Sequence, residues 1–256
     1  MDEGMIWHVQ DFTSTEADVV AARGWRRGLG LEAGASLRHI TSRIRFRDPD
    51  RRPLVLPGGS IHHRNETLVR PGDPWLALHG ARGSGAWSFA ARAGVSIPLG
   101  RTEPNPFALA RLGLPHEHVQ FGTGTWDPFA ELGLGRRFGA WNTSLAARAR
   151  FVVATNAHGY HAGDRYYASA NAERHIAGRW RGALGLDLVR ERTETWDGRR
   201  EEEGNLGRTD LLASITAARP LGARNVVSFA LHVPLVTRAS GSQLSYPLIA
   251  TVGWSR

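Results

Sequence analysis

The chain has 256 residues, with 30 Gly, 9 Trp and no Cys, and its formal charge is +8. The absence of Cys excludes disulfides and Cys-ligated metal or redox sites. The basic excess is spread over many segments rather than grouped on one helix, which argues against nucleic acid as a partner. No apolar run approaches the roughly 18 residues that a membrane-spanning helix needs.

The first quarter of the chain predicts strands of uneven quality. Met5–Phe12 alternates weakly between apolar and polar residues, and Thr15–Ala22 is a poor strand candidate. Leu29–Phe46 is a long segment with a period of two, which is the period of a strand. Its apolar residues change face part-way along, so we expect a bulge near His39. Arg47–Gly72, rich in Asp, Pro and Gly, is expected to be a polar loop.

The rest of the chain alternates more clearly. In Ala86–Pro98, for example, Trp87 and Phe89 share one face, and Arg92 lies on the other. A period of two with one apolar and one polar face is typical of a strand. In chain order the further expected strands are Asp73–Ala81, Ala86–Pro98, Pro128–Phe138, Trp141–Val153, Asp164–Ile176, Trp180–Glu194, Arg208–Ala218, Asn225–Thr237 and Gln243–Ser255.

The connections between these segments alternate in length. Tight turns at Gly24, Gly83–Gly85, Gly139–Ala140, Ala177–Gly178 and Pro220–Gly222 alternate with longer loops, of which about 47–72, 99–127 and 195–207 are the longest. Short periplasmic turns and long outer loops are typical of outer-membrane barrels. The sequence therefore predicts an all-β fold: one domain over 1–256, a transmembrane up-and-down antiparallel β-barrel of about 12 strands in the lipid bilayer of a bacterial outer membrane.

Two further expectations follow from this barrel. An even strand count would place both chain ends on the periplasmic side. Met1-Asp2-Glu3 lacks the basic start of a signal peptide, so we expect an exported protein's mature or shortened sequence. Aromatic residues near strand ends on the apolar face would form girdles at the two water–lipid interfaces, with ordinary core packing as the alternative. These aromatic residues are Trp87, Trp141, Trp180, Tyr246 and Trp254.

Residues on the polar parity are expected to face the lumen. Charges of both signs there suit two interiors: a salt-bridged and largely plugged one, or a narrow pore lined by an Arg ladder that favours anions. The expected lumen-lining residues are Arg92, Glu131, Arg137, Arg148, Arg150, Asn171, Glu173, His175, Arg181 and Asp187.

Other candidate chemistry is sparse. His62-His63 and the pair His116 and His118 are short His groups, and the second pair would share a strand face and could ligate a metal. Loop solvation explains them more simply, and we expect no metal and no cofactor. His158, His161 and Asp164 lie near a predicted rim, but nothing marks a nucleophile. The common hydrolase and nucleotide motifs are absent.

The segment from His116 to Pro128, which contains Gly-Thr-Gly-Thr-Trp-Asp-Pro, is unusual. It resembles the segment that enters a central strand in the transporter-like outer-membrane barrels linked to meta-pathway phenol degradation. Gly94–Gly100 and Gly72-Asp73 fit the same family. The resemblance implies a membrane barrel that passes hydrophobic or aromatic compounds, with no catalytic residues. It rests on His116, His118, Gly122, Gly124, Trp126, Asp127 and Pro128.

The residues themselves give a physical reason for this motif. Gly122 and Gly124 permit a tight backbone, and Asp127-Pro128 sets a turn before a strand. Taken together, the sequence predicts a non-enzymatic, porin-like channel or transporter for small molecules, which are hydrophobic, aromatic or anionic. Two alternatives stay open: an outer-membrane barrel with an enzyme site at its rim, and a soluble ligand-binding β-barrel. Oligomeric state is not fixed by the sequence.

Overall fold

The computed structural model describes residues 7–25, 28–55, 65–241 and 245–256. Nearly all of them belong to one antiparallel sheet. Eleven strands follow one another along this sheet, each hydrogen-bonded to the next. They are β1 (Trp7–Gly24), β2 (Leu29–Arg47), β5 (Trp75–Ser84), β6 (Trp87–Ser96), β7 (Asp127–Phe138), β8 (Trp141–Arg150), β10 (Arg165–Ala177), β11 (Trp180–Glu191), β13 (Asn205–Leu221), β14 (Asn225–Gly241) and β15 (Ile249–Ser255).

Smaller elements lie in the long connections. Strands β3 (Pro53–Leu54) and β4 (Glu66–Pro71) pair with β2, and β9 (Tyr160–His161) pairs with β12 (Thr195–Trp196) in a separate sheet. Helix α1 spans Pro106–Arg111. No helix within the described ranges is long and apolar enough to cross a membrane.

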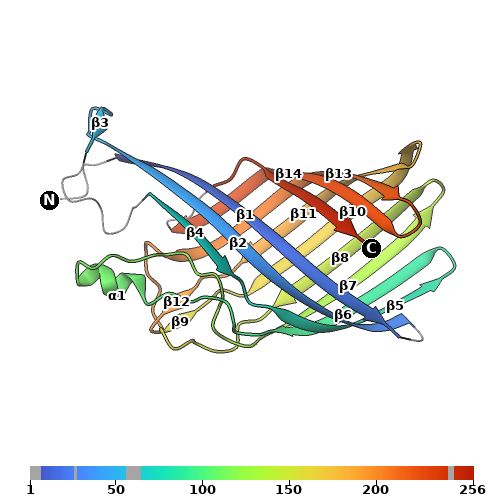
Figure 1. The fold of residues 1–256 in the computed structure, drawn as a ribbon, viewed down its shortest axis with the longest axis horizontal. Helices are drawn as coiled ribbons and strands as arrows, with labels where there is room; N and C mark the ends of the chain where they lie inside the picture. The colour runs from blue at the N-terminus through green and yellow to red at the C-terminus, as the bar shows by residue number, and fades with distance from the viewer. Residues whose placement is uncertain (1–6, 26–27, 56–64, 242–244) are drawn as a thin grey trace.

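The tilted strands wrap round, so that β1 and β2 cross in front of the strands behind them (Figure 1). The tight turns gather at one end of the molecule. The long connections, with α1, β9 and β12, gather at the other (Figure 1). This is the up-and-down antiparallel barrel that the alternating loop lengths predict.

The two faces of the sheet differ in polarity and exposure. Leu132 and Leu184 lie on one face and are 66% and 61% exposed, whereas Asp127 and Asp187 lie on the other and are 0% and 3% exposed. Large apolar side chains therefore point out and carboxylates point in, towards the concave side. A soluble barrel would bury its apolar face, so the exposed leucines argue against that alternative.

The first hairpin corrects two expectations. Thr15–Ala22 is no separate segment, because β1 is one continuous strand that pairs with β2 from Trp7–Arg47 to Gly24–Gly30. No bulge occurs at His39, because this register runs through it without a shift. The outer face of the sheet has a band of apolar side chains, which we call the apolar band. The apolar residues of β2 change face because β1 and β2 extend beyond this band at the long-loop end.

Beyond the band, the inner face of β2 becomes the apolar one. Ile40 is 3% exposed and packs with Leu68 and Phe121, while Arg43 and Arg45 occupy the outer face. The expected loop 47–72 also contains a strand, β4, whose Leu68 lies opposite Ile40. Strands β4 and β5 occupy successive stretches of the same edge of β2.

The described strands also correct the expected chain ends. β1 starts at the long-loop end, and β15 ends at the tight-turn end, since its Ser255 lies opposite Val226. The ends differ because two expected segments merge into β1, so that eleven strands follow one another along the described sheet. Among the described residues, β1 and β15 are the two edges of the sheet, each paired on one side. Met5, Ile6 and Leu244, which belong to expected strands, lie outside the described residues.

Candidate functional site

One register row crosses the inner face of five neighbouring strands. His79 of β5 lies opposite Arg92 of β6, which lies opposite Glu131 of β7. Glu131 lies opposite Arg148 of β8, which lies opposite Tyr167 of β10. We call these five residues the polar row. Because directly opposed residues on one face of an antiparallel sheet are neighbours, the row is a continuous polar strip along the inner wall.

Ion pairs neutralise only part of the polar row. Arg92 binds Glu131 at 2.5 Å and Glu32 of β2 at 3.2 Å, and Glu32 also contacts His79 at 3.0 Å. Arg148, in contrast, has no carboxylate within 4 Å among the described residues. The row therefore has a compensated end at β5–β7 and a cationic position at β8.

Two aromatic rings lie beside the polar row on the same face. Trp75 and Phe129 contact edge to face, with centroids 5.9 Å apart. Arg92 stacks over both rings, and Arg148 approaches Phe129 at 5.1 Å. Stacking holds the long side chains of both arginines against the wall. The alternation along β7 could have placed Phe129 on the inner face, because it has the opposite parity to the outward-facing Leu132.

A second polar group lies further round the inner face. Asp187 of β11 accepts a hydrogen bond from the Tyr167 hydroxyl at 2.6 Å and contacts His232 Nδ1 at 3.0 Å. Asp210 of β13, 1% exposed, accepts a hydrogen bond from the Tyr246 hydroxyl at 2.9 Å. These contacts give both buried carboxylates polar partners, as buried charges require.

The loop between β6 and β7 is fixed over the long-loop end by two carboxylates. Asp73 accepts hydrogen bonds from the backbone N–H groups of Gly100 and Thr123, at 2.8 and 2.7 Å. Asp127 accepts from the hydroxyls of Thr123 and Thr125, at 2.8 and 2.6 Å. Because Asp127 belongs to β7 and Asp73 lies two residues before β5, the two carboxylates tie the loop to the barrel wall.

Glycine lets this loop approach Asp73 closely. A Cβ at Gly122 would lie 2.4 Å from the Asp73 carboxylate, and Gly124 adopts a φ of +71°. The expected tight backbone at Gly122 and Gly124 is confirmed. The motif leads into a strand, but Asp127 and Pro128 do not form the expected turn, because they are the first two residues of β7 and already pair with β6.

An apolar cluster holds the long connections together as one cap. Phe107 of α1, Tyr160 of β9 and Trp196 of β12 are all buried and pack with Val152. We call the connections 97–126, 151–164 and 192–204 the cap. Since Phe121 of the same cap packs against β2 and β4, the cap extends across the long-loop end rather than standing beside it.

One acid in the cap is held in an unusual environment. Glu194 accepts hydrogen bonds from Trp196 Nε1 and from the backbone N–H of Asn205, both at 3.2 Å. Burial nevertheless raises its pKa above the ordinary value for Glu. Burial likewise raises the pKa of the neighbouring Tyr160 hydroxyl, and the charge of Glu194 adds to that effect.

The expected lumen-lining residues occupy inner-face register positions. Arg150 lies 3.8 Å from Asp127, and Arg181 lies 3.4 Å from Glu173. Arg137 and Asn171 lie on the same face. His175 lies opposite Arg181 at the last paired position before a register shift, and its Nε2 contacts the Gly178 carbonyl at the turn. Whether these residues line an open passage stays a prediction.

The histidines form no metal site within the described ranges, where no group of three or more His, Cys, Asp or Glu could hold an ion. His116 and His118 lie in the cap rather than on a strand, with ring centroids 5.1 Å apart. His62 and His63 lie outside the described residues.

The three rim residues do not converge either. Asp164 accepts a hydrogen bond from the backbone N–H of Val152, whereas His161 Nδ1 contacts the Ala154 carbonyl. His158 donates its backbone N–H to Asn156. These separate contacts lend no support to a catalytic set at the rim.

By register, four of the five aromatic residues expected in the two girdles lie on the outer face, all at the tight-turn end, so a girdle at the other end stays a prediction. Trp87, Trp141 and Trp254 lie on the outer face near tight turns, and Trp180 begins β11 at such a turn. Tyr246 instead turns inward to Asp210, because a buried carboxylate needs a donor. Trp126 is 56% exposed at the cap.

Comparison with known proteins identifies the fold. No family model matches the chain, and no curated protein matches its sequence. The crystal structure of an outer membrane channel from Pseudomonas putida F1 is similar, with a TM-score of 0.64 and 12% sequence identity, over 95% of this chain and 82% of that chain. A link to phenol degradation stays a prediction. The chain has the fold of an outer-membrane channel barrel.

Proposed function

We propose that this chain is a channel of the bacterial outer membrane that passes small solutes along the inner face of its barrel. The observation that carries the proposal is the polar row, from His79 to Tyr167, on the concave side of a barrel whose outer face is apolar. Charged residues on a barrel wall that the lipid does not touch provide a polar path for solutes. The cap narrows entry at the long-loop end.

The uncompensated charge of Arg148 supports a preference for anions. Arg92 pairs with two carboxylates, those of Glu32 and Glu131, so this end of the row has no excess positive charge. Arg148 contacts the Phe129 ring, and although Glu131 lies opposite it in the register, Arg148 has no carboxylate within 4 Å among the described residues. A fixed cation without a counter-ion raises the local concentration of anions and selects for them.

Single-channel recording in a planar bilayer with a salt gradient tests this proposal. We expect conductance steps whose reversal potential indicates anion preference, and Arg148→Gln should shift that potential towards cations. Arg190→Gln is the matched control, because Arg190 lies on the outer face of β11 at the long-loop end. Insertion without conductance, or equal shifts in both variants, would overturn the proposal.

Aromatic solutes are the second candidate, favoured by the half-buried ring of Trp75, which packs edge to face on the buried Phe129 beside two arginines. Planar rings stack on aromatic side chains and on guanidinium groups. Block of the anion current by benzoate, but not by acetate at the same concentration, would favour this candidate over inorganic anions. Trp75→Leu should weaken that block while leaving the current without benzoate intact, because Arg148 keeps its contact with Phe129.

A further inference from the structure

A repeated arrangement of Arg and Trp lies on the outer face at the tight-turn end. Each guanidinium stacks on a tryptophan ring of the neighbouring strand, and the three pairs follow one another round the barrel. We call them the Arg–Trp band. The pairs are Arg136 over Trp87, Arg174 over Trp141 and Arg219 over Trp180, at 4.8, 5.1 and 5.7 Å from the ring centroids.

Strand register creates this repeat. Trp87 lies directly opposite Arg136, and Trp141 lies directly opposite Arg174. Each pair therefore joins one hairpin to the next rather than closing its own hairpin. All three pairs lie within a few residues of a tight turn, so the band stands at one level of the barrel, where its apolar face meets water.

The band is cationic and lacks protein counter-ions. Within the described part of the chain, no carboxylate lies within 4 Å of Arg136, Arg174 or Arg219. The five tight-turn segments 23–28, 82–87, 136–141, 174–180 and 219–225 each contain Arg and contain no Asp or Glu. Because no carboxylate of the described chain neutralises these arginines, the tight-turn end of the barrel attracts anions from the solvent or the lipid.

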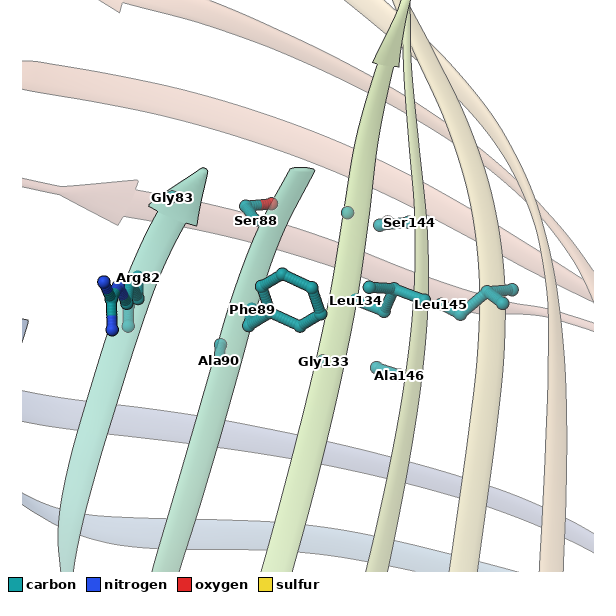
Figure 2. A pocket seen from close by; sticks show the side chains of 12 residues that line it. Arg82, Gly83, Ser88, Phe89, Ala90, Gly133, Leu134, Ser144, Leu145 and Ala146 are labelled. Atoms are coloured by element: carbon teal, nitrogen blue, oxygen red, sulfur yellow. The ribbon is translucent and has the colours of Figure 1, made fainter. Parts of the chain in front are cut away.

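An apolar hollow begins beside the band. Phe89, Leu134 and Leu145 lie side by side on the outer face of β6, β7 and β8 (Figure 2). They line a hollow of about 490 Å³. Phe89 is two residues from Trp87, and Leu134 is two residues from Arg136, so the hollow continues from the band towards the middle of the apolar face.

We propose that the Arg–Trp band binds the phosphate groups of anionic glycerophospholipids, with an acyl chain lying over the hollow. A guanidinium presents paired N–H donors that suit a phosphate, and stacking on Trp holds it in place. One molecule thus satisfies both surfaces: a negative headgroup at the band and an apolar chain over Phe89 and Leu134. This lipid site is independent of whether the barrel conducts.

Native mass spectrometry of the folded full chain tests the proposal. We expect phosphatidylglycerol to be retained more than phosphatidylcholine. The triple variant R136Q/R174Q/R219Q should lose phosphatidylglycerol by roughly fivefold per Arg removed, as the attraction of a basic residue to an anionic leaflet implies. Phosphatidylcholine retention should not change.

A matched triple variant removes three outer-face arginines from the other end of the barrel, namely R43Q/R190Q/R238Q. We expect it to retain phosphatidylglycerol like the wild type. Equal loss in both triple variants, or no loss in the band variant, would overturn the proposal. Displacement by inorganic phosphate at the lipid's own concentration would also overturn it, because the site would then recognise phosphate alone.

Folding is checked by the shift in gel migration that an intact barrel shows before heating. Should the triple variant fail to fold, the single variants R174Q and R174K replace it. R174K keeps the charge on β10 but loses the planar guanidinium. Retention in the order wild type, R174K, R174Q supports the proposal, and equal retention in all three contradicts it.

Discussion

At Asp127 a single side chain connects a sequence motif to the barrel wall. Its carboxylate accepts two hydroxyl hydrogen bonds and lies 3.8 Å from Arg150, so its complete burial is compensated. The sequence indicates a special backbone at Gly122 and Gly124. It does not indicate that Asp127 and Asp73 would share Thr123, because the two acids are far apart along the chain.

Leu186 tests the assignment of faces residue by residue. It lies mid-strand on the outer face of β11, opposite Ala170 and Ala213. We expect Leu186→Arg to destabilise the folded barrel by about 2–4 kcal/mol, because a charge would face the hydrocarbon.

Val69→Arg is the control, since Val69 is also exposed but lies beyond the apolar band, opposite His39. It should cost at most about 1 kcal/mol, the magnitude found near an interface. The folding equilibrium in lipid vesicles, measured by Trp fluorescence over a range of urea concentrations, gives both costs in free energy. Equal costs would mean that the limits assigned to the apolar band of the outer face are wrong.

At the scale of elements, the cap is the part of the fold that the alternation of apolar and polar residues does not predict. Helix α1, β9 and β12 are short, and their order comes from tertiary contacts among Phe107, Tyr160 and Trp196. Asn105 caps α1 by accepting from the N–H groups of Phe107 and Ala108, and it also reaches Asp197. Such contacts between separate loops leave no periodic signal in the sequence.

The cap should be more stable at low pH through Glu194. Its pKa is raised in the folded cap, so the folded state binds the proton more tightly than the unfolded one. This contribution is fully present below the ordinary Glu pKa and is lost as pH rises through the raised value. Glu194→Gln keeps the acceptor oxygen and removes the charge.

Hydrogen exchange around Trp196 measures this effect. At neutral pH, we expect Glu194→Gln to slow exchange in the cap relative to the wild type, with the difference vanishing in acid. Glu202→Gln, at an exposed position, should change nothing. Faster exchange in Glu194→Gln at neutral pH would contradict the assigned direction of the pKa shift.

At the scale of the whole molecule, an apolar outer face, a polar inner face and a cap combine into a barrel with one covered end. The cap is attached to the wall through Asp73 on the β5 side and Asp127 on β7. Because Asp73 is an acceptor for two backbone N–H groups, removing it should loosen the cap without altering the strand ladders.

Asp73→Ala should therefore increase the conductance or the frequency of current substates. Hydrogen bonds to a charged group contribute about 1.5–3 kcal/mol each, and Asp73 accepts them from Gly100 and Thr123. Asp48→Ala is the control, because Asp48 accepts a hydrogen bond from the Arg52 N–H in a turn outside the cap. Identical single-channel traces from Asp73→Ala and the wild type would show that the cap does not limit the current.

The sequence by itself determined the antiparallel barrel and most of its faces, because a strand with lipid on one side must alternate at every second residue. Leu186 and Arg148 were assigned to the correct faces for this reason. Only the tertiary structure determined the packing of the cap, the inward turn of Tyr246 and the change of the apolar face of β2 from outer to inner beyond His39. There the strands leave the apolar band, and packing between distant segments determines which face is apolar.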